Sequence, residues 1–350
     1  MFTGLPRKQE VFHVTLQAVA ELQADGLFDN IFISTWTSEF ETFRDWCLPI
    51  VNRYPLTRVT LLAREPPHVN LTLKLTGNPF HVLLSINHVL QRLPQDDWLL
   101  RTRSDIALGK KLIVELVNRT RGLPPIVPGP TSIYQNRVWT TWMDPTNFFY
   151  LGVDSFFATV RDFSRFIDYD AELFVRCRSM GFHTSFHFNP LKARFPTFIA
   201  YIEELERYGI GIGPGTVMPD ASRNHKCYVK LLALYWKILA DNYCIYNMAS
   251  QYGFLVPPPG SEIVDDTRID HDWPEDFDGF VAQVESLRSR HKVPYCSQSG
   301  VLDRVLAAAP RHGGLFAECL EEINRGDLGE DDWWRQAIPK FFRDMTGQQD

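Results

Sequence analysis

The stretch DDWLLRTRSD, residues 96–105, decides the fold that we expect for this chain, because an apolar run leads straight into charged side chains. The run predicts a buried strand over Trp98–Thr102. Arg101, Arg103 and Asp105 lie at its carboxyl end, and burying these charges without partners would be costly. We therefore expect them at an edge of a sheet, where they either bind a ligand or form a structural ion pair.

The residues before this stretch alternate between helical and strand-like periodicity. A helix with its apolar residues at helical spacing is expected to stop at Asp25-Gly26. Asn78-Pro79 has the pattern of a helix cap followed by proline at the first helical position. The expected strands cover residues 1–3, 30–34 and 58–62, and the expected helices cover residues 12–24, 43–52 and 78–93.

Helices between consecutive strands predict right-handed crossovers and a mostly parallel α/β sheet that is covered on both faces. Ligands of such sheets lie at the carboxyl ends of the strands. Farther along, residues Cys227–Met248 are apolar but contain Lys230, Lys237 and Asp241, which predicts a buried helix rather than a membrane span. No linker composition divides the chain, so we expect one domain over residues 1–350.

Composition narrows the class of protein. The chain has 350 residues, of which 45% are hydrophobic and 22% charged, as in ordinary globular proteins. Its net charge of -6 disfavours a nucleic-acid partner, which would require a basic face. Its six cysteines include no CxxC pair, and the opening MFTGLPRKQE lacks the apolar stretch of a signal peptide. These features predict a reducing, cytoplasmic location.

Three strand ends carry candidate ligand-binding residues. Gly4 would let a ligand approach the backbone closely, and Arg7 would pair with a diphosphate. Thr35 and Trp36 follow the second expected strand, where the indole would stack on a base or sugar. The competing interpretations are a Gly-Leu-Pro turn and a core tryptophan. At the third strand end, Asp105 would hold a divalent ion that bridges a diphosphate, while a neighbouring arginine offsets the charge of the departing group.

Four segments in this order resemble the WavE lipopolysaccharide-synthesis family, whose members are glycosyltransferase-like proteins related to the GT-A fold. The segments are IFISTW (31–36), LLRTRSDIAL (99–108), FFYLGVDSFFAT (148–159) and AELFVRC (171–177), and the resemblance spans roughly residues 1–180. It implies a GT-A-like mixed sheet flanked by helices with a helical C-terminal part. Residues 1–108 would form the donor half, and residues 109–350 the acceptor half and C-terminal helices.

The resemblance also implies roles for individual residues. Thr35 and Trp36 fall in the nucleotide pocket, and Arg101, Arg103 and Asp105 fall at the diphosphate, in a motif that replaces the usual Asp-x-Asp. Two departures stand out. Few residues precede Gly4, so the first strand is short or its start is missing, and Arg103 takes the place of a first carboxylate. A divalent metal, Mn or Mg, therefore remains an open question.

An inverting transfer needs a base for the acceptor hydroxyl, and two acids are candidates. Asp154 follows the strand-like residues 148–151, and Glu172 opens an expected helix, where an acid is also favoured by the helix dipole. We favour Asp154 slightly. A retaining enzyme would use the donor phosphate instead, and neither acid would then be the base.

Three histidines are also considered as metal ligands. His183 and His187 have the spacing of a zinc pair, but no glutamate lies between them and phenylalanines surround them. We interpret this pair as structural. His271 lies in an acidic loop, residues 265–272, that is either solvated or supplies a late metal ligand.

We thus expect a glycosyltransferase that moves a sugar from a nucleotide-sugar donor to a growing bacterial surface polysaccharide. The acceptor would be a glycan or a lipid-linked glycan, and aromatic and basic residues at 333–343 would contact the inner membrane peripherally or pack on the core. The alternatives are a non-catalytic scaffold subunit of an assembly complex and, less favoured, an S-adenosylmethionine-dependent methyltransferase.

Overall fold

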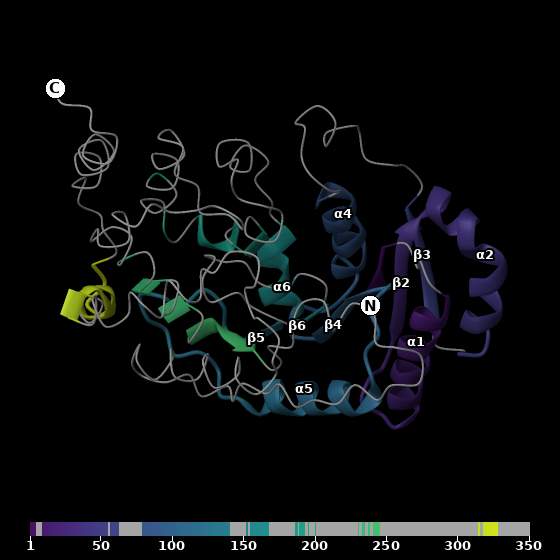
Figure 1. Ribbon diagram of the computed structural model, residues 1–350, viewed down its shortest axis with the longest axis horizontal. Coiled ribbons are helices and arrows are strands. Elements are labelled where there is room, and N and C mark those ends of the chain that lie inside the picture. Colours follow the sequence, from purple (N-terminus) through teal and green to yellow (C-terminus); the bar gives the residue numbers. More distant parts are fainter. Residues whose placement is uncertain are drawn as a thin grey trace, which may run out of the picture.

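A computed structural model shows the architecture of the chain (Figure 1). The residues that it describes are 1–4, 9–54, 57–62, 79–140, 152, 155–167, 186–187, 189–192, 195, 200, 230, 233–234, 237–238, 241–245, 314–315 and 318–327. The fold below is that of these residues.

The described strands form a seven-stranded mixed sheet in the order β3-β2-β1-β4-β6-β5-β7. Strands β3, β2, β1 and β4 are parallel, whereas β6 runs antiparallel to both of its neighbours. Strand β7 is parallel to β5, so every described strand except β6 ends at the same edge. The strands are β1 (Phe2–Thr3), β2 (Ile31–Trp36), β3 (Thr57–Leu62), β4 (Trp98–Arg103), β5 (Val138–Thr140), β6 (Ser155–Thr159) and β7 (Tyr243–Ile245).

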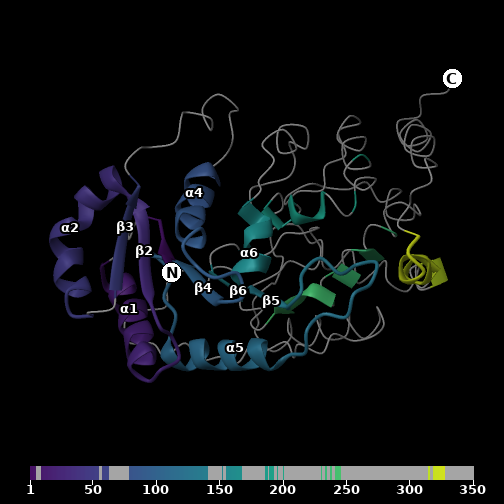
Figure 2. The ribbon, with the colours of Figure 1, turned by 180° about the vertical axis from the view of Figure 1, so that it is seen from behind.

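Helices cover both faces of the sheet, as expected. Figures 1 and 2 show α4 and α6 on one face and α1 and α5 on the other, with α2 next to β3. The chain is therefore a mixed α/β sheet flanked by helices. The helices are α1 (Gln9–Ala24), α2 (Thr37–Val51), α4 (Pro79–Leu90), α5 (Lys110–Gly122) and α6 (Val160–Ile167), with a short 3₁₀ helix at Asn189–Leu191.

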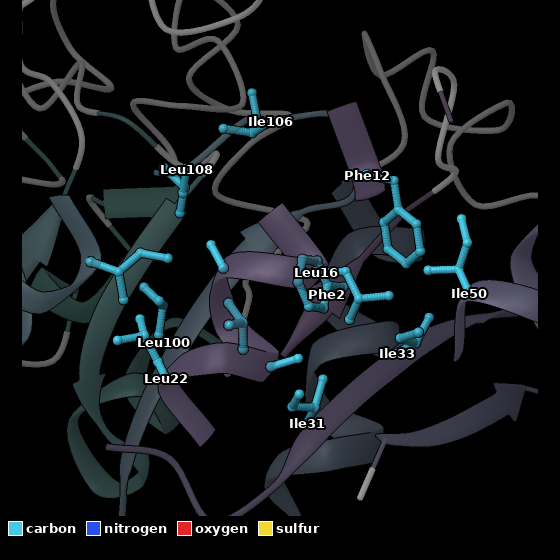
Figure 3. Packing of buried hydrophobic residues seen from close by; sticks show 14 of the residues in the cluster. Phe2, Phe12, Leu16, Leu22, Ile31, Ile33, Ile50, Leu100, Ile106 and Leu108 are labelled. Atoms are coloured by element: carbon cyan, nitrogen blue, oxygen red, sulfur yellow. The ribbon is translucent and has the colours of Figure 1, made fainter. Parts of the chain in front are cut away.

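The largest described core lies between the sheet and α1, α2 and α5 (Figure 3). Alternate residues of a strand face the same side, so Ile31 and Ile33 of β2 both point into this core. Phe2 of β1 packs edge-on against Phe12 of α1, with ring centroids 5.3 Å apart. This packing holds β1, which has two residues, in the middle of the sheet.

The predicted end of the first helix is confirmed. Gly26 has φ 80°, a conformation that favours glycine, and its N–H donates to the Gln23 carbonyl at 3.0 Å. The Leu27 N–H donates to the Leu22 carbonyl at 2.8 Å, which completes a Schellman motif. The chain direction therefore reverses here and leads into β2.

Other boundaries differ from the predicted ones. Strand β2 continues to Trp36, and α2 begins directly at Thr37 rather than near residue 43. The predicted start of a helix at Asn78-Pro79 is confirmed for Pro79, the first residue of α4, while Asn78 lies outside the described residues. That helix ends at Leu90 instead of residue 93.

The predicted helix over residues 227–248 is wrong at its end, because Tyr243–Ile245 forms β7 and pairs with β5. Asn242 accounts for the change. Its side-chain N–H₂ donates to the carbonyls of Ile238 and Thr131 at 2.9 and 2.7 Å, and its oxygen accepts the Ile133 N–H at 2.7 Å. These bonds end the helix and turn the chain toward the sheet. Among the described helices, none has the length and apolarity needed to span a bilayer.

Candidate active site

The middle of the sheet contains a topological switch point. From β1 the chain continues to β2 on one side, and β4 lies on the other side of β1. In open α/β sheets ligands bind at the carboxyl ends of the strands at such a point. Here those ends are Thr3-Gly4 and Arg103-Ser104, with Thr3 directly beside Arg103. The sequence prediction that these residues share one edge is confirmed for this part of the motif.

The turn after β4 is fixed by its backbone and by Ser104. The Ser104 N–H donates to the Thr3 carbonyl at 3.0 Å, and the Ser104 hydroxyl donates to the Gly4 carbonyl at 3.0 Å. The Ile106 N–H closes the turn on the Arg103 carbonyl at 3.3 Å. These bonds connect the ends of β1 and β4 without using the charged side chains.

Arg103 and Asp105 form a bidentate ion pair. Arg103 Nε donates to Asp105 Oδ1 at 2.8 Å, and Nη2 donates to Oδ2 at 2.7 Å. The side chains are 34% and 16% exposed, respectively, so the pair is open to solvent on one side. The same fork geometry binds a phosphate group.

Arg101 lies two residues earlier on the same face of β4, and its side chain is buried. Its Nε donates to the Thr3 hydroxyl at 2.8 Å. Burial first, and the Arg101 guanidinium second, lower the pKa of the Met1 amino group to about 5. Arg101 is thus a buried positive charge on the same face of β4 as Arg103.

Gly4 provides open backbone at this edge. Its φ of 85° lies in the region that favours glycine, and no described atom lies within 4 Å of the position that a Cβ would take. A ligand at the switch point would therefore meet backbone here rather than a side chain.

Thr35 and Trp36 end β2, next to β1, and both side chains are buried. Alternation along the strand puts Thr35 on the face of Ile31 and Ile33, which is the face that packs on α1. Trp36 is 4% exposed. The structure places both residues at the predicted edge, and their contact with a nucleotide stays a prediction.

Four predicted residues lie outside the described part of the chain: Arg7, Asp154, Glu172 and His271. The strand-like residues 148–151 lie outside it as well. The described strand β6 begins at Ser155, directly after Asp154, and Ser155 pairs with Thr102 of β4. The roles of these four residues stay predictions.

A buried polar cluster that starts at the same edge, at Thr140 and Gly152, was not predicted as part of the site. The carbonyl of Gly152 accepts from the Thr140 hydroxyl at 2.5 Å and from His187 Nε2 at 3.1 Å. Because a carbonyl can only accept, Nε2 carries a proton, and Nδ1 lies 3.0 Å from the Tyr243 hydroxyl. Tyr243 in turn lies 3.2 Å from the Tyr134 hydroxyl.

Burial raises the pKa of both phenols, Tyr134 and Tyr243, so both remain protonated donors. The cluster therefore gives the Gly152 carbonyl two hydrogen bonds, three residues before β6 starts. Its signal in the sequence was weak, because phenylalanines flank His187 and its partners in the cluster lie far away along the chain. Phe186 and Phe156 do pack against its ring.

The prediction of a divalent ion at this edge stays a prediction. Both Asp105 oxygens accept from Arg103, and no group of three or more candidate ligands occurs among the described residues. Magnesium and manganese require several oxygen ligands. The guanidinium of Arg103 is also suited to binding an anion at this edge.

Comparisons with protein-family models, with curated proteins and with solved structures each found no match to this chain.

Proposed function

We propose that the chain is a glycosyltransferase whose nucleotide-sugar donor binds at the switch point between β1 and β4. The observation that carries this proposal is the group of Arg101, Arg103 and Asp105 beside the open backbone of Gly4. A diphosphate needs a bidentate donor and close approach to backbone, and this edge offers both.

The topology supports the same proposal. The parallel part of the sheet has the order β3-β2-β1-β4, which matches the 3-2-1-4 part of a nucleotide-binding Rossmann sheet, across its switch point. The sheet continues through antiparallel β6 into β5 and β7, so it is mixed, as the resemblance to the GT-A-like family implies.

The reaction would be displacement at the anomeric carbon of the donor sugar. The bond from that carbon to the diphosphate oxygen breaks, and a bond to the acceptor oxygen forms. The diphosphate leaves with an additional negative charge, which the Arg103 guanidinium would stabilise. The acceptor proton passes to a base, for which Asp154 remains our first candidate and Glu172 the second.

The acceptor half would begin at the same edge. Strand β6 opens there, and the Gly152 cluster fixes the chain just before it. We propose a glycan or a lipid-linked glycan of a bacterial surface polysaccharide as the acceptor, with peripheral presentation at the inner membrane. The aromatic and basic residues 333–343, on which the membrane contact depends, lie outside the described residues.

A thermal-stability screen tests the donor class. Ligands that bind the folded state raise its melting temperature, so nucleoside diphosphates and nucleotide sugars should do so, with or without Mg or Mn. S-adenosylmethionine and nucleosides without phosphate should not. Stabilisation by S-adenosylmethionine alone would refute the proposal in favour of a methyltransferase.

Donor hydrolysis separates an enzyme from a binding subunit. An active transferase slowly passes the sugar to water when no acceptor is present, so the free nucleoside diphosphate should accumulate with the best donor of the screen. Binding of that donor without turnover, in the presence of candidate glycan acceptors as well, would identify a scaffold subunit instead.

A further inference from the structure

We propose that Asp105 is an internal anion that occupies the Arg103 guanidinium in the ligand-free protein, and that the donor diphosphate displaces it. The inference rests on the proposed function for the identity of the ligand. It adds that Asp105 opposes diphosphate binding, whereas a metal-binding carboxylate would promote it. The ion pair would therefore set the affinity of the site.

The turn that contains the pair has hydrogen bonds of its own. Arg103 and Asp105 are two residues apart within one turn, and the turn is held by Ser104 and by the Ile106 N–H. The Ile106 carbonyl also accepts the Thr15 hydroxyl at 2.8 Å, and the Leu108 N–H donates to that hydroxyl at 2.9 Å. These bonds anchor the turn to α1 independently of the ion pair.

The exchange conserves the bonding of the guanidinium. Arg103 donates to Asp105 through Nε and Nη2, and a phosphate group accepts from an arginine fork in the same planar geometry. Arg103 is 34% exposed, so an incoming anion reaches it from solvent. The released carboxylate of Asp105, whose side chain is 16% exposed, would regain water.

The position of the Arg103–Asp105 pair favours an exchange of its carboxylate for a ligand anion. Breaking a fully buried pair leaves an uncompensated charge, which is costly. This pair is partly exposed and lies at the point where ligands of such sheets bind. Its carboxylate occupies the fork that the ligand needs.

Inorganic pyrophosphate tests the inference by titration calorimetry in the presence of EDTA. Asp105→Asn should bind pyrophosphate about three- to tenfold more tightly than the unchanged chain, because the internal competitor is gone. Arg103→Ala should lose most of the affinity. In the double variant Asp105→Asn should bring no gain, since there is no guanidinium to release.

Asp96→Asn is the matched control. It removes the same charge from another Arg–Asp pair, Arg161–Asp96, which lies at the opposite end of β4. Its affinity for pyrophosphate should equal that of the unchanged chain. An equal gain in Asp96→Asn, or a gain in the double variant, would overturn the inference because the effect would then be general electrostatics.

Weaker or unchanged pyrophosphate binding by Asp105→Asn would also overturn it, since Asp105 would then support the ligand or ignore it. If Asp105→Asn does not fold, the Arg103 Nε–H signal of the unchanged chain decides by NMR, assigned by its loss in Arg103→Lys. It should shift on addition of pyrophosphate, and an unmoved signal refutes the exchange.

Different results would refute the proposed transferase function and the proposed exchange at Arg103. A gain for Asp105→Asn without turnover of any nucleotide sugar would refute the transferase and leave the exchange standing. Turnover of a nucleotide sugar without that gain would refute the exchange alone.

Discussion

Strand β4 has an arginine–aspartate pair near each end, and the two pairs differ in their solvent exposure and in the segments that they join. At the amino end, Arg161 Nη2 donates to Asp96 at 2.8 Å, with side chains 43% and 87% exposed, and the pair bridges two segments far apart in sequence. At the carboxyl end, Arg103 and Asp105 meet within one turn and are more enclosed. The two pairs therefore differ in their surroundings, because solvent screens the first pair, whereas the second lies at the edge where we propose that the donor binds.

A third carboxylate near β4, that of Asp162, has a different set of partners. Asp162 begins α6, near the amino end of β4, and it is fully buried. Its oxygens accept the Gln135 and Asn136 N–H groups at 2.8 and 3.0 Å and the Thr159 hydroxyl at 2.9 Å. The Asp162 N–H donates back to the Thr159 hydroxyl at 3.2 Å, so Thr159 caps the helix. A carboxylate that collects backbone donors serves the fold, whereas Asp105 meets a guanidinium with both oxygens.

The largest effect should come from Arg103→Ala. We expect sugar transfer to slow by about 100- to 1000-fold, equivalent to about 2.7–4 kcal/mol, because one positive group at the leaving diphosphate is lost. The free energy of unfolding should change by about 1 kcal/mol or less. Steady-state rates and urea unfolding measure the two quantities. A variant that turns over normally but unfolds early would show that the carboxyl-end pair is structural after all.

Asp162→Ala should show the opposite pattern. Its removal leaves the Gln135 and Asn136 N–H groups without their acceptor, so the free energy of unfolding should fall by about 3 kcal/mol. Affinity for the donor, measured on the remaining folded protein, should stay unchanged. Asp162→Asn keeps one acceptor oxygen and should lose less stability. If Asp162→Ala weakened donor binding at full stability, the distinction between the two ends would be lost.

Gly4→Ala tests the backbone of the ligand edge. Because φ is 85°, a side chain here should destabilise the fold by about 1–2 kcal/mol although the space is open. Gly122→Ala is the matched control: it lies in α5, has no strained φ and has no described atom near its Cβ position. That control should be neutral or slightly stabilising. Equal stability of both variants in thermal unfolding would contradict the assigned Gly4 conformation.

The smallest effect should come from Asp96→Asn. The exposed pair with Arg161 should contribute within about 0.5 kcal/mol to the free energy of unfolding, and that contribution should disappear in high salt. Unfolding measured at low and high ionic strength checks this. A loss of several kcal/mol would mean that the amino-end pair is held far more rigidly than its exposure indicates.

The part of the candidate site that comes from one short segment was predictable. Arg101, Arg103 and Asp105 come from a single strand end, so their shared edge follows from local periodicity and the charges beside it. The Gly152 cluster was not predictable, because Thr140, His187 and Tyr243 meet only when β5, β6 and β7 are assembled. Nothing local to His187 indicates these partners.

By itself, the sequence determined the alternation of helices and strands in the first third of the chain, the helix stop at Gly26 and the strand that leads into Arg103. These features depend on contacts between near neighbours, which composition and spacing record directly. Tertiary structure alone decided that β6 runs antiparallel and that Tyr243–Ile245 is a strand rather than the end of a helix. Pairing between distant strands is set by packing of the whole sheet, so no local pattern encodes it.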